Sequence, residues 1–150
     1  MRRLLLAAVL LLAASPAAAQ SRDRLLQDAM DRIAREEKAS VYGPFARDAR
    51  RDLDGDGVPD RVVLFTIEGM GGGNNYWFYL GVQLSGSRWR PITEGIGGKL
   101  NRMPESLRVE GRTIVVPMRE WTETDPGCCP TRPAVARFRL RGGRIVEIEG

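Results

Sequence analysis

The chain has 150 residues, with 23 basic and 19 acidic side chains, 43% hydrophobic residues and no histidine. This length corresponds to about one domain. The absence of histidine excludes Ser-His-Asp and Cys-His catalysis and every metal site that needs an imidazole ligand. Arginines are interleaved with acidic residues along the chain instead of clustering, so the composition argues against nucleic-acid binding.

Residues 1–19 have the pattern of a secretory signal peptide. Two arginines near the start precede an apolar run over residues 4–14 and small residues at 17–19. The apolar run is shorter than the ~20 residues of a membrane span. We expect cleavage after Ala19, which leaves one secreted domain, residues 20–150, that is periplasmic or extracellular and has no membrane span. No cysteine lies near the cleavage site, so we expect no lipid attachment there.

Residues 22–38 are predicted to form an amphipathic helix, because apolar side chains recur at helical spacing opposite a charged face. The apolar stripe consists of Leu25, Leu26, Ala29, Met30, Ile33 and Ala34. Ser21 is the expected N-cap, and Asp23 suits the first turn. Such a stripe is typical of a helix that covers a sheet; a partner-binding helix is the alternative.

After Pro44 the pattern changes to strands. Residues 61–68 carry apolar side chains on both faces, which is typical of a central strand covered on both sides. One face has Val62 and Leu64, and the other has Val63, Phe65 and Ile67. Residues 76–85 alternate, with Phe78, Leu80, Val82 and Leu84 on one face and Trp77, Tyr79 and Gln83 on the other.

Two hairpins are predicted near the C-terminus. The first has a type II′ turn at Gly111-Arg112, which pairs Val109 with Ile114. For the second we prefer a three-residue loop at 141–143. A two-residue turn would place Phe138 opposite Glu147, whereas the longer loop gives the pairs Phe138–Val146 and Arg137–Glu147.

Taken together, these elements predict an α+β fold, in which an N-terminal helix packs on a mostly antiparallel sheet of about six strands in hairpin order. In the predicted register, Arg137 and Arg139 lie on the outer face of the sheet. That face is either a solvated strand surface with a cross-strand ion pair or an anion-binding stripe.

An unusual group of aspartates lies at residues 52–60, which read D-L-D-G-D-G-V-P-D. Counted from Asp52, carboxylates occupy positions 1, 3, 5 and 9 (Asp52, Asp54, Asp56 and Asp60), and Val58 at position 7 offers its backbone carbonyl. This is the ligand layout of an EF-hand loop, with Gly57 at the sharp turn. Position 12 is Val63 instead of glutamate, and a strand follows, so the segment is not an EF-hand.

The loop resembles the D-x-D-G-D-G-x-x-D loops of secreted β-rich proteins, including integrin-type FG-GAP repeats, in which the loop precedes a strand. That resemblance implies a structural calcium ion. A further ligand would come from Asp48, Glu68, water or elsewhere in the fold. The alternative is a polar turn with solvated carboxylates, because aspartate and glycine both favour turns.

The two cysteines of the chain, Cys128 and Cys129, are neighbours in the segment T-D-P-G-C-C-P-T-R-P. Export implies an oxidising compartment. Yet adjacent α-carbons are about 3.8 Å apart, below the usual disulfide range. Three states therefore stay open: a vicinal disulfide, a reduced and packed pair, or interchain bridges. Two thiols without histidine make a poor zinc site.

The segments D-L-D-G-D-G-V-P-D, Y-W-F-Y-L-G-V-Q-L and D-P-G-C-C-P-T-R-P-A-V-A-R-F-R-L occur in one order, over residues 48–149. This order resembles a group of poorly characterised secreted bacterial proteins with a D-P-x-C-C-P motif, including the LppP/LprE lipoproteins. The resemblance implies an envelope location and brings no established reaction. The N-terminal helix lies outside it, and the lipoprotein cysteine is missing.

No residue pattern here specifies a reaction, so we expect a non-enzymatic envelope protein with a calcium-stabilised loop, acting as a binding or accessory module. Trp77, Tyr79 and Trp121 are the candidates for a ligand surface, which would suit an envelope glycan or protein. The alternative for Trp77 and Tyr79 is a core covered by the helix. The alternative function is a thiol–disulfide protein or sensor that uses Cys128 and Cys129.

Overall fold

The computed structural model describes residues 16–86 and 91–149, and their side chains except those of 16–23 and 43–47. Apart from residues 16–19, the predicted signal peptide lies outside the described residues, and its cleavage stays a prediction. The described residues form one α-helix, nine strands and a short 3₁₀ turn, η1, at Met70–Gly72.

The helix α1 spans Pro16–Glu36, so the predicted helix exists but begins earlier than expected. Ser21 lies inside it, and its prediction as the N-cap was wrong, because the alanines at 17–19 favour helix and continue it toward the N-terminus. The helix ends where Lys38 adopts a left-handed φ of 51°. The Ala39 N–H then donates to the Ala34 carbonyl at 2.8 Å, as in a Schellman cap.

The first sheet is antiparallel and has the strand order β1-β2-β3-β4. Its strands are β1 (Ser40–Arg51), β2 (Asp60–Glu68), β3 (Tyr76–Gln83) and β4 (Ile92–Gly98). Strand β1 was not predicted, because its sequence does not alternate and contains Gly43 and Pro44. It lies at an edge of the sheet and its register shifts between Tyr42 and Arg47, the setting in which a strand tolerates proline.

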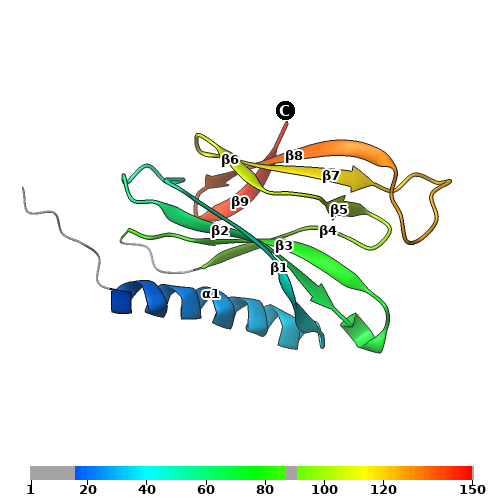
Figure 1. Cartoon of the computed structure of the whole chain (residues 1–150), viewed down its shortest axis with the longest axis horizontal. Coiled ribbons are helices and arrows are strands. Elements are labelled where there is room, and N and C mark those ends of the chain that lie inside the picture. Colours follow the sequence, from blue (N-terminus) through cyan, green and yellow to red (C-terminus); the bar gives the residue numbers. More distant parts are fainter. Residues whose placement is uncertain (1–15, 87–90, 150) are drawn as a thin grey trace, which may run out of the picture.

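The second sheet is also antiparallel, with the order β5-β7-β8-β9 and β6 paired to β7. Its strands are β5 (Arg102–Pro104), β6 (Arg108–Glu110), β7 (Thr113–Glu120), β8 (Arg132–Arg141) and β9 (Arg144–Ile148). The prediction of one sheet of about six strands in an α+β fold was therefore wrong. The chain is mostly β, and its strands form two sheets with the helix on the outer side of the first (Figure 1).

The chain leaves the first sheet at the turn between β4 and β5. Leu100 has a left-handed φ of 62°, and the Asn101 N–H donates to the Gly98 carbonyl at 3.1 Å. Alternation in the sequence predicts strands and their faces. It does not show whether the next strand pairs with the same sheet or starts a second one. Both arrangements bury the same apolar faces, so the pattern could not distinguish one sheet from two.

Two apolar clusters hold the three layers together. The cluster between the sheets includes Val62, Leu64, Leu80, Ile114 and Phe138. The cluster between α1 and the first sheet consists of Leu26, Met30, Ala34, Val63, Phe65 and Ile67, with Tyr79 packed against it. Strand β2 is thus buried on both faces, which confirms its prediction as a central strand.

Gly81 lets the helix approach the first sheet closely. A Cβ at this position would lie 3.0 Å from side-chain atoms of both Leu26 and Val63. Because packed interiors leave few voids, a larger residue here would force the helix and the sheet apart.

The hairpin at Gly111-Arg112 has the predicted register, with Val109 opposite Ile114 and a φ of 58° at Gly111. The second hairpin does not. Arg141 pairs with Arg144, so the turn has two residues, and positive φ angles at Gly142 and Gly143 suit a type I′ turn.

Phe138 consequently lies opposite Glu147 and Arg137 opposite Ile148, so both predicted pairs were wrong. The carboxylate is tolerated on this face because β9 is an edge strand. There Glu147 forms a bidentate ion pair with Arg102, with N–O distances of 2.7 and 3.0 Å. Instead of the predicted pair with Glu147, Arg137 forms an ion pair with Glu110, with an N–O distance of 3.6 Å.

Candidate functional site

The aspartate loop, residues 52–60, connects β1 to β2 and is folded by its own carboxylates. Asp52 accepts the N–H groups of Gly55 and Gly57 at 2.6 and 3.1 Å, one on each oxygen. Asp54 accepts the Asp56 N–H at 3.2 Å. The two glycines have φ of 88° and 84°, which residues with a side chain rarely adopt. The alternating aspartates and glycines thus specify the loop locally.

Asp60 anchors the loop in the interior and is 0% exposed. One of its carboxylate oxygens accepts the Leu53 N–H at 2.8 Å, and the other accepts the Ser85 N–H at 2.9 Å. Burial raises the pKa of the Asp60 carboxyl; the two backbone N–H groups oppose this, and the nearby charges of Asp54 and Asp56 add to it. The loop therefore holds negative charge that its own hydrogen bonds offset only in part.

Three of the predicted ligands converge. Carboxylate oxygens of Asp52, Asp54 and Asp60 all lie within 4.8 Å of one another. Calcium binds oxygens at about 2.3–2.6 Å, so two ligands of one ion lie at most about 5 Å apart. The three side chains fit a calcium ion in both spacing and chemistry.

The other predicted ligands are placed differently. Asp56 is outside the convergent group: its Oδ1 accepts the Val58 N–H at 2.8 Å, and its carboxylate fills the space beside Gly86. Val58, whose backbone carbonyl is a predicted ligand, is exposed. Of the two suggested additional ligands, Asp48 pairs with Arg61 at 2.7 Å. Glu68 ends β2, at the opposite end of that strand from Asp60.

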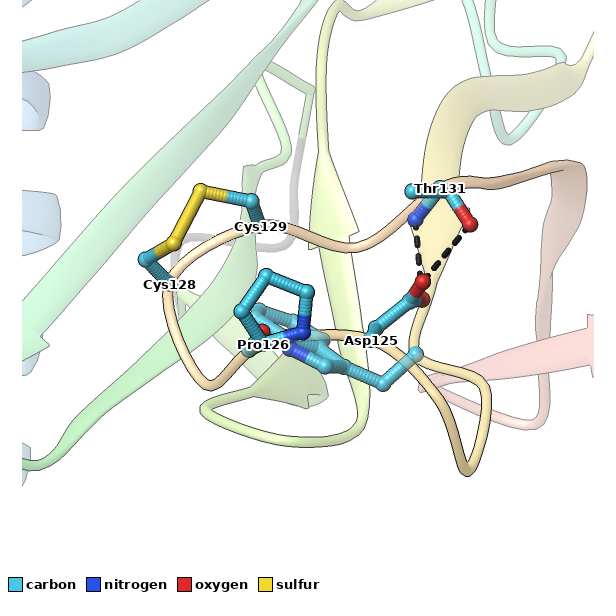
Figure 2. The surroundings of a disulfide bond; sticks show 6 residues. Asp125, Pro126, Cys128, Cys129 and Thr131 are labelled. Carbon is cyan, nitrogen blue, oxygen red and sulfur yellow. Dashed lines mark hydrogen bonds between the residues drawn. A yellow bond between two sulfur atoms is a disulfide. The ribbon is translucent and has the colours of Figure 1, made fainter.

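The cysteine loop, residues 121–131, connects β7 to β8. In the structure the sulfur atoms of Cys128 and Cys129 are bonded to each other, with a Cα–Cα distance of 3.8 Å (Figure 2). Both cysteines are exposed, whereas the following Pro130 is buried. A reagent could thus reach the sulfur atoms without unfolding the domain.

Asp125 holds the cysteine loop in shape. Its carboxylate accepts the N–H of Thr131 at 3.0 Å and the Thr131 hydroxyl at 2.7 Å (Figure 2). It also accepts the N–H of Thr122 at 2.8 Å. These hydrogen bonds lower the pKa of Asp125 to about 2. Sequence reasoning missed this residue, although an aspartate before proline in a polar segment is a known signal for a side-chain-closed turn.

The Pro126 carbonyl joins the two halves of the cysteine loop, because it accepts the indole N–H of Trp121 at 3.1 Å and the backbone N–H of Cys129 at 3.0 Å. The backbone N–H of Trp121 donates to Asn101 at 3.1 Å and so ties the loop to the β4–β5 turn. The loop frame is therefore made by hydrogen bonds that do not involve the sulfur atoms.

The predicted ligand surface is divided between two regions. Tyr79 stacks on Phe65, with ring centroids 5.4 Å apart, and belongs to the core under the helix. Trp77 lies on the same strand and is 40% exposed. Trp121 is part of the cysteine loop. The structure thus gives Trp77 and Tyr79 different environments, and a role in ligand binding stays a prediction for all three residues.

Residues 90–143 match the family model described as LppP/LprE lipoprotein, which is less than half of the chain. The matched stretch contains β4 to β8 and the cysteine loop; the aspartate loop and α1 lie outside it. The family consists of lipoproteins, which is compatible with an envelope-associated protein. Searches of curated proteins and of solved structures each gave no match.

The match is narrower than the resemblance over residues 48–149 that the sequence suggested. The likeness of residues 52–60 to FG-GAP loops is not covered by it and stays a prediction. Among the residues that the structure describes, no helix is long and apolar enough to cross a membrane.

Proposed function

We propose that this chain is an exported, non-enzymatic module of the cell envelope whose aspartate loop is stabilised by calcium. The observation that carries the calcium proposal is the convergence of oxygens from Asp52, Asp54 and the fully buried Asp60. Close carboxylates repel one another unless a cation neutralises them. Calcium prefers such hard oxygen ligands.

The role proposed for the ion is structural. Asp60 is hydrogen-bonded to Leu53, at the start of the loop, and to Ser85, just after β3. An ion on Asp60 would therefore stabilise the contacts between the start of the loop, the start of β2 and the segment after β3. The rest of the proposal is a binding or accessory role toward an envelope glycan or protein, for which the exposed Trp77 offers an aromatic contact.

The calcium proposal is tested by thermal unfolding of the exported protein in chelator and over a calcium series. Calcium at 100 times its Kd should stabilise the fold by about 2.7 kcal/mol. Asp54→Ala should abolish this gain. A flat response up to several millimolar calcium would show that the segment is a polar turn.

Asp56→Ala is the matched comparison, because Asp56 is an exposed aspartate of the same loop that lies outside the convergent group. Loss of the calcium response in both variants would favour the full set of ligands predicted from the sequence. Loss in Asp54→Ala alone would favour the three-carboxylate site.

A second candidate function is thiol–disulfide exchange at Cys128 and Cys129, which is favoured by their exposure in a loop with its own hydrogen-bonded frame. A thiolate of a partner dithiol attacks one sulfur, forms a mixed disulfide and releases the other sulfur as a thiolate. The partner's second thiol then displaces the remaining cysteine. The partner is oxidised to a disulfide, and the loop is reduced to two thiols.

Exchange is tested by alkylation of the folded protein after stepwise treatment with a small dithiol over a pH series. The redox proposal expects two thiols to become reactive together, at least one with a lowered pKa, while the domain stays folded. A pair that resists reduction until the domain unfolds, or thiols that are inert once formed, would exclude it.

A further inference from the structure

A pocket lies beside the aspartate loop, at the end of the structure where the turns of both sheets meet. Its volume is about 330 Å³. The apolar part of its lining comes from both sheets and consists of Leu53, Leu84, Ile92 and Leu140. Leu53 and Leu84 are buried, and the other two are half-buried. The pocket thus offers a small apolar surface in the gap between the sheets.

Three exposed arginines, Arg112, Arg139 and Arg141, also line this pocket. Within the described part of the chain, no carboxylate lies at ion-pair distance from any of them. Six other arginines of the described residues do have acidic partners: Arg61, Arg102, Arg108, Arg119, Arg132 and Arg137. The arginines at the pocket therefore carry positive charge without a protein counter-charge, whereas about half of the other described arginines are paired with a carboxylate.

Arg112 also connects the pocket to the aspartate loop. It extends from the β6–β7 turn over the loop backbone, and its guanidinium occupies the space that a side chain at Gly55 would fill. Asp54, one of the three convergent carboxylates, lines the same pocket. A group bound between the arginines would therefore sit next to the proposed calcium site.

We propose that this pocket binds a small amphiphilic anion, with the acidic group on the arginines and a short apolar chain on the leucine and isoleucine surface. Arginine matches the geometry of carboxylates and phosphates because its planar fork donates two parallel hydrogen bonds. Ligand pockets range over about 300–1,000 Å³, so the volume here suits a short chain and excludes a whole two-chain lipid.

The second part of the proposal is that calcium strengthens this binding; it rests on the proposed function. Without calcium, the carboxylates of the loop repel an anion in the pocket, Asp54 most directly. With calcium bound, the two positive charges of the ion offset two of the three convergent carboxylate charges, so that repulsion is weakened. Since coupling between two sites is reciprocal, the anion must raise the affinity for calcium by the same factor.

The test uses isothermal titration of the exported protein with octanoate and with octyl phosphate, each in chelator and in saturating calcium. Octanol and octylammonium are the uncharged and cationic controls. We expect the anions to bind, the controls not to bind, and calcium to tighten anion binding about tenfold. The acid that binds better identifies the source, a free carboxylate or a phosphate headgroup.

The matched variants are Arg112→Gln and Arg141→Gln at the pocket and Arg144→Gln as the control. Arg144 is an exposed arginine on the same hairpin as Arg141 but does not line this pocket. Each pocket variant should weaken anion binding about tenfold, as expected for one charged hydrogen-bonding group. Arg144→Gln should leave it unchanged.

The outcomes separate this inference from the proposed function. If calcium stabilises the protein but neither anion binds, or if octanol binds as well as octanoate, the pocket proposal is overturned and the calcium loop stands. If the anions bind in an arginine-dependent way but calcium gives no stabilisation and no coupling, the calcium site is overturned and anion recognition stands. Equal losses of anion affinity in Arg112→Gln and Arg144→Gln would also overturn the pocket proposal.

Discussion

The aspartate loop and the cysteine loop are both polar turns between neighbouring strands, and they lie at opposite ends of the molecule (Figure 1). They use carboxylates in opposite ways. In the cysteine loop, Asp125 accepts three hydrogen bonds and its pKa falls to about 2. In the aspartate loop, burial and neighbouring charges raise the pKa of Asp60.

The difference lies in how the negative charge of each loop is stabilised. Asp125 is stabilised as an anion by groups of its own loop, so the cysteine loop is complete without a ligand. The carboxylates of the aspartate loop also accept backbone N–H groups, but three of them converge and one of these is buried. Like charges at such distances raise the free energy of the folded state, so binding of a cation would stabilise this loop.

The largest effect is expected for Asp60→Ala. The substitution leaves the buried N–H of Leu53 and the partly buried N–H of Ser85 without their acceptor. Each unsatisfied buried donor costs about 1–3 kcal/mol, so the loss of the acceptor for two donors should lower the free energy of unfolding by about 2–6 kcal/mol. Denaturant unfolding in chelator measures this change.

The control for Asp60→Ala is Asp54→Ala, whose exposed carboxylate accepts one N–H of its own loop. In chelator it should change stability by no more than about 0.5 kcal/mol. Equal losses for the two variants would contradict the assignment of Asp60 as the interior anchor of the loop.

A more local effect is expected for Asp125→Ala. The loop loses the acceptor that joins Thr122 to Thr131, so amide hydrogen exchange at these two residues should become faster, and the disulfide should be reduced faster. Glu123→Ala is the control, because Glu123 is exposed in the same loop and is not one of these acceptors. If both variants exchange alike, hydrogen bonding by Asp125 does not hold the loop.

The lowered pKa of Asp125 predicts that the cysteine loop opens in acid. The Asp125 pKa is about 2 in the folded protein, against an ordinary value of 3.8. A lowered pKa means that the charged carboxylate stabilises the loop fully above pH about 4, and that this contribution is lost as the pH falls toward 2. A carboxyl titration by NMR checks it; a midpoint at or above 3.8 would contradict the hydrogen-bonded frame.

Only a small effect on global stability is expected from reducing the disulfide. The bond closes the shortest loop that two cysteines can form, so the chain-entropy contribution is about 1 kcal/mol. Cys128→Ser with Cys129→Ser should therefore lower the melting temperature by only a few degrees. A loss of several kcal/mol would mean that the sulfur atoms, and not Asp125 and Pro126, organise the loop.

Much of the local structure could be predicted because it depends on neighbours in the sequence. Period-two alternation correctly assigned Val62 and Leu64 to one face of β2 and Val63, Phe65 and Ile67 to the other. Turn chemistry correctly placed the hairpin at Gly111-Arg112. Strand β1 was missed, because an edge strand with a register shift need not alternate.

The last hairpin shows the limit of this reasoning. The predicted register keeps Glu147 away from Phe138, because it assumes that an inward-facing position is apolar. In the structure the strand lies at a sheet edge, and Arg102, 45 residues earlier in the sequence, neutralises the carboxylate. Only the tertiary arrangement supplies such a partner.

The sequence by itself determined the spacing of Asp52, Asp54 and the glycines, because these hydrogen bonds and φ angles join residues a few positions apart. It also determined the neighbouring cysteines. The tertiary structure decided that Asp60 is buried against Ser85 and that Arg112 lies over Gly55. These contacts join distant segments, and they follow from how two sheets pack, which the alternation of apolar residues leaves open.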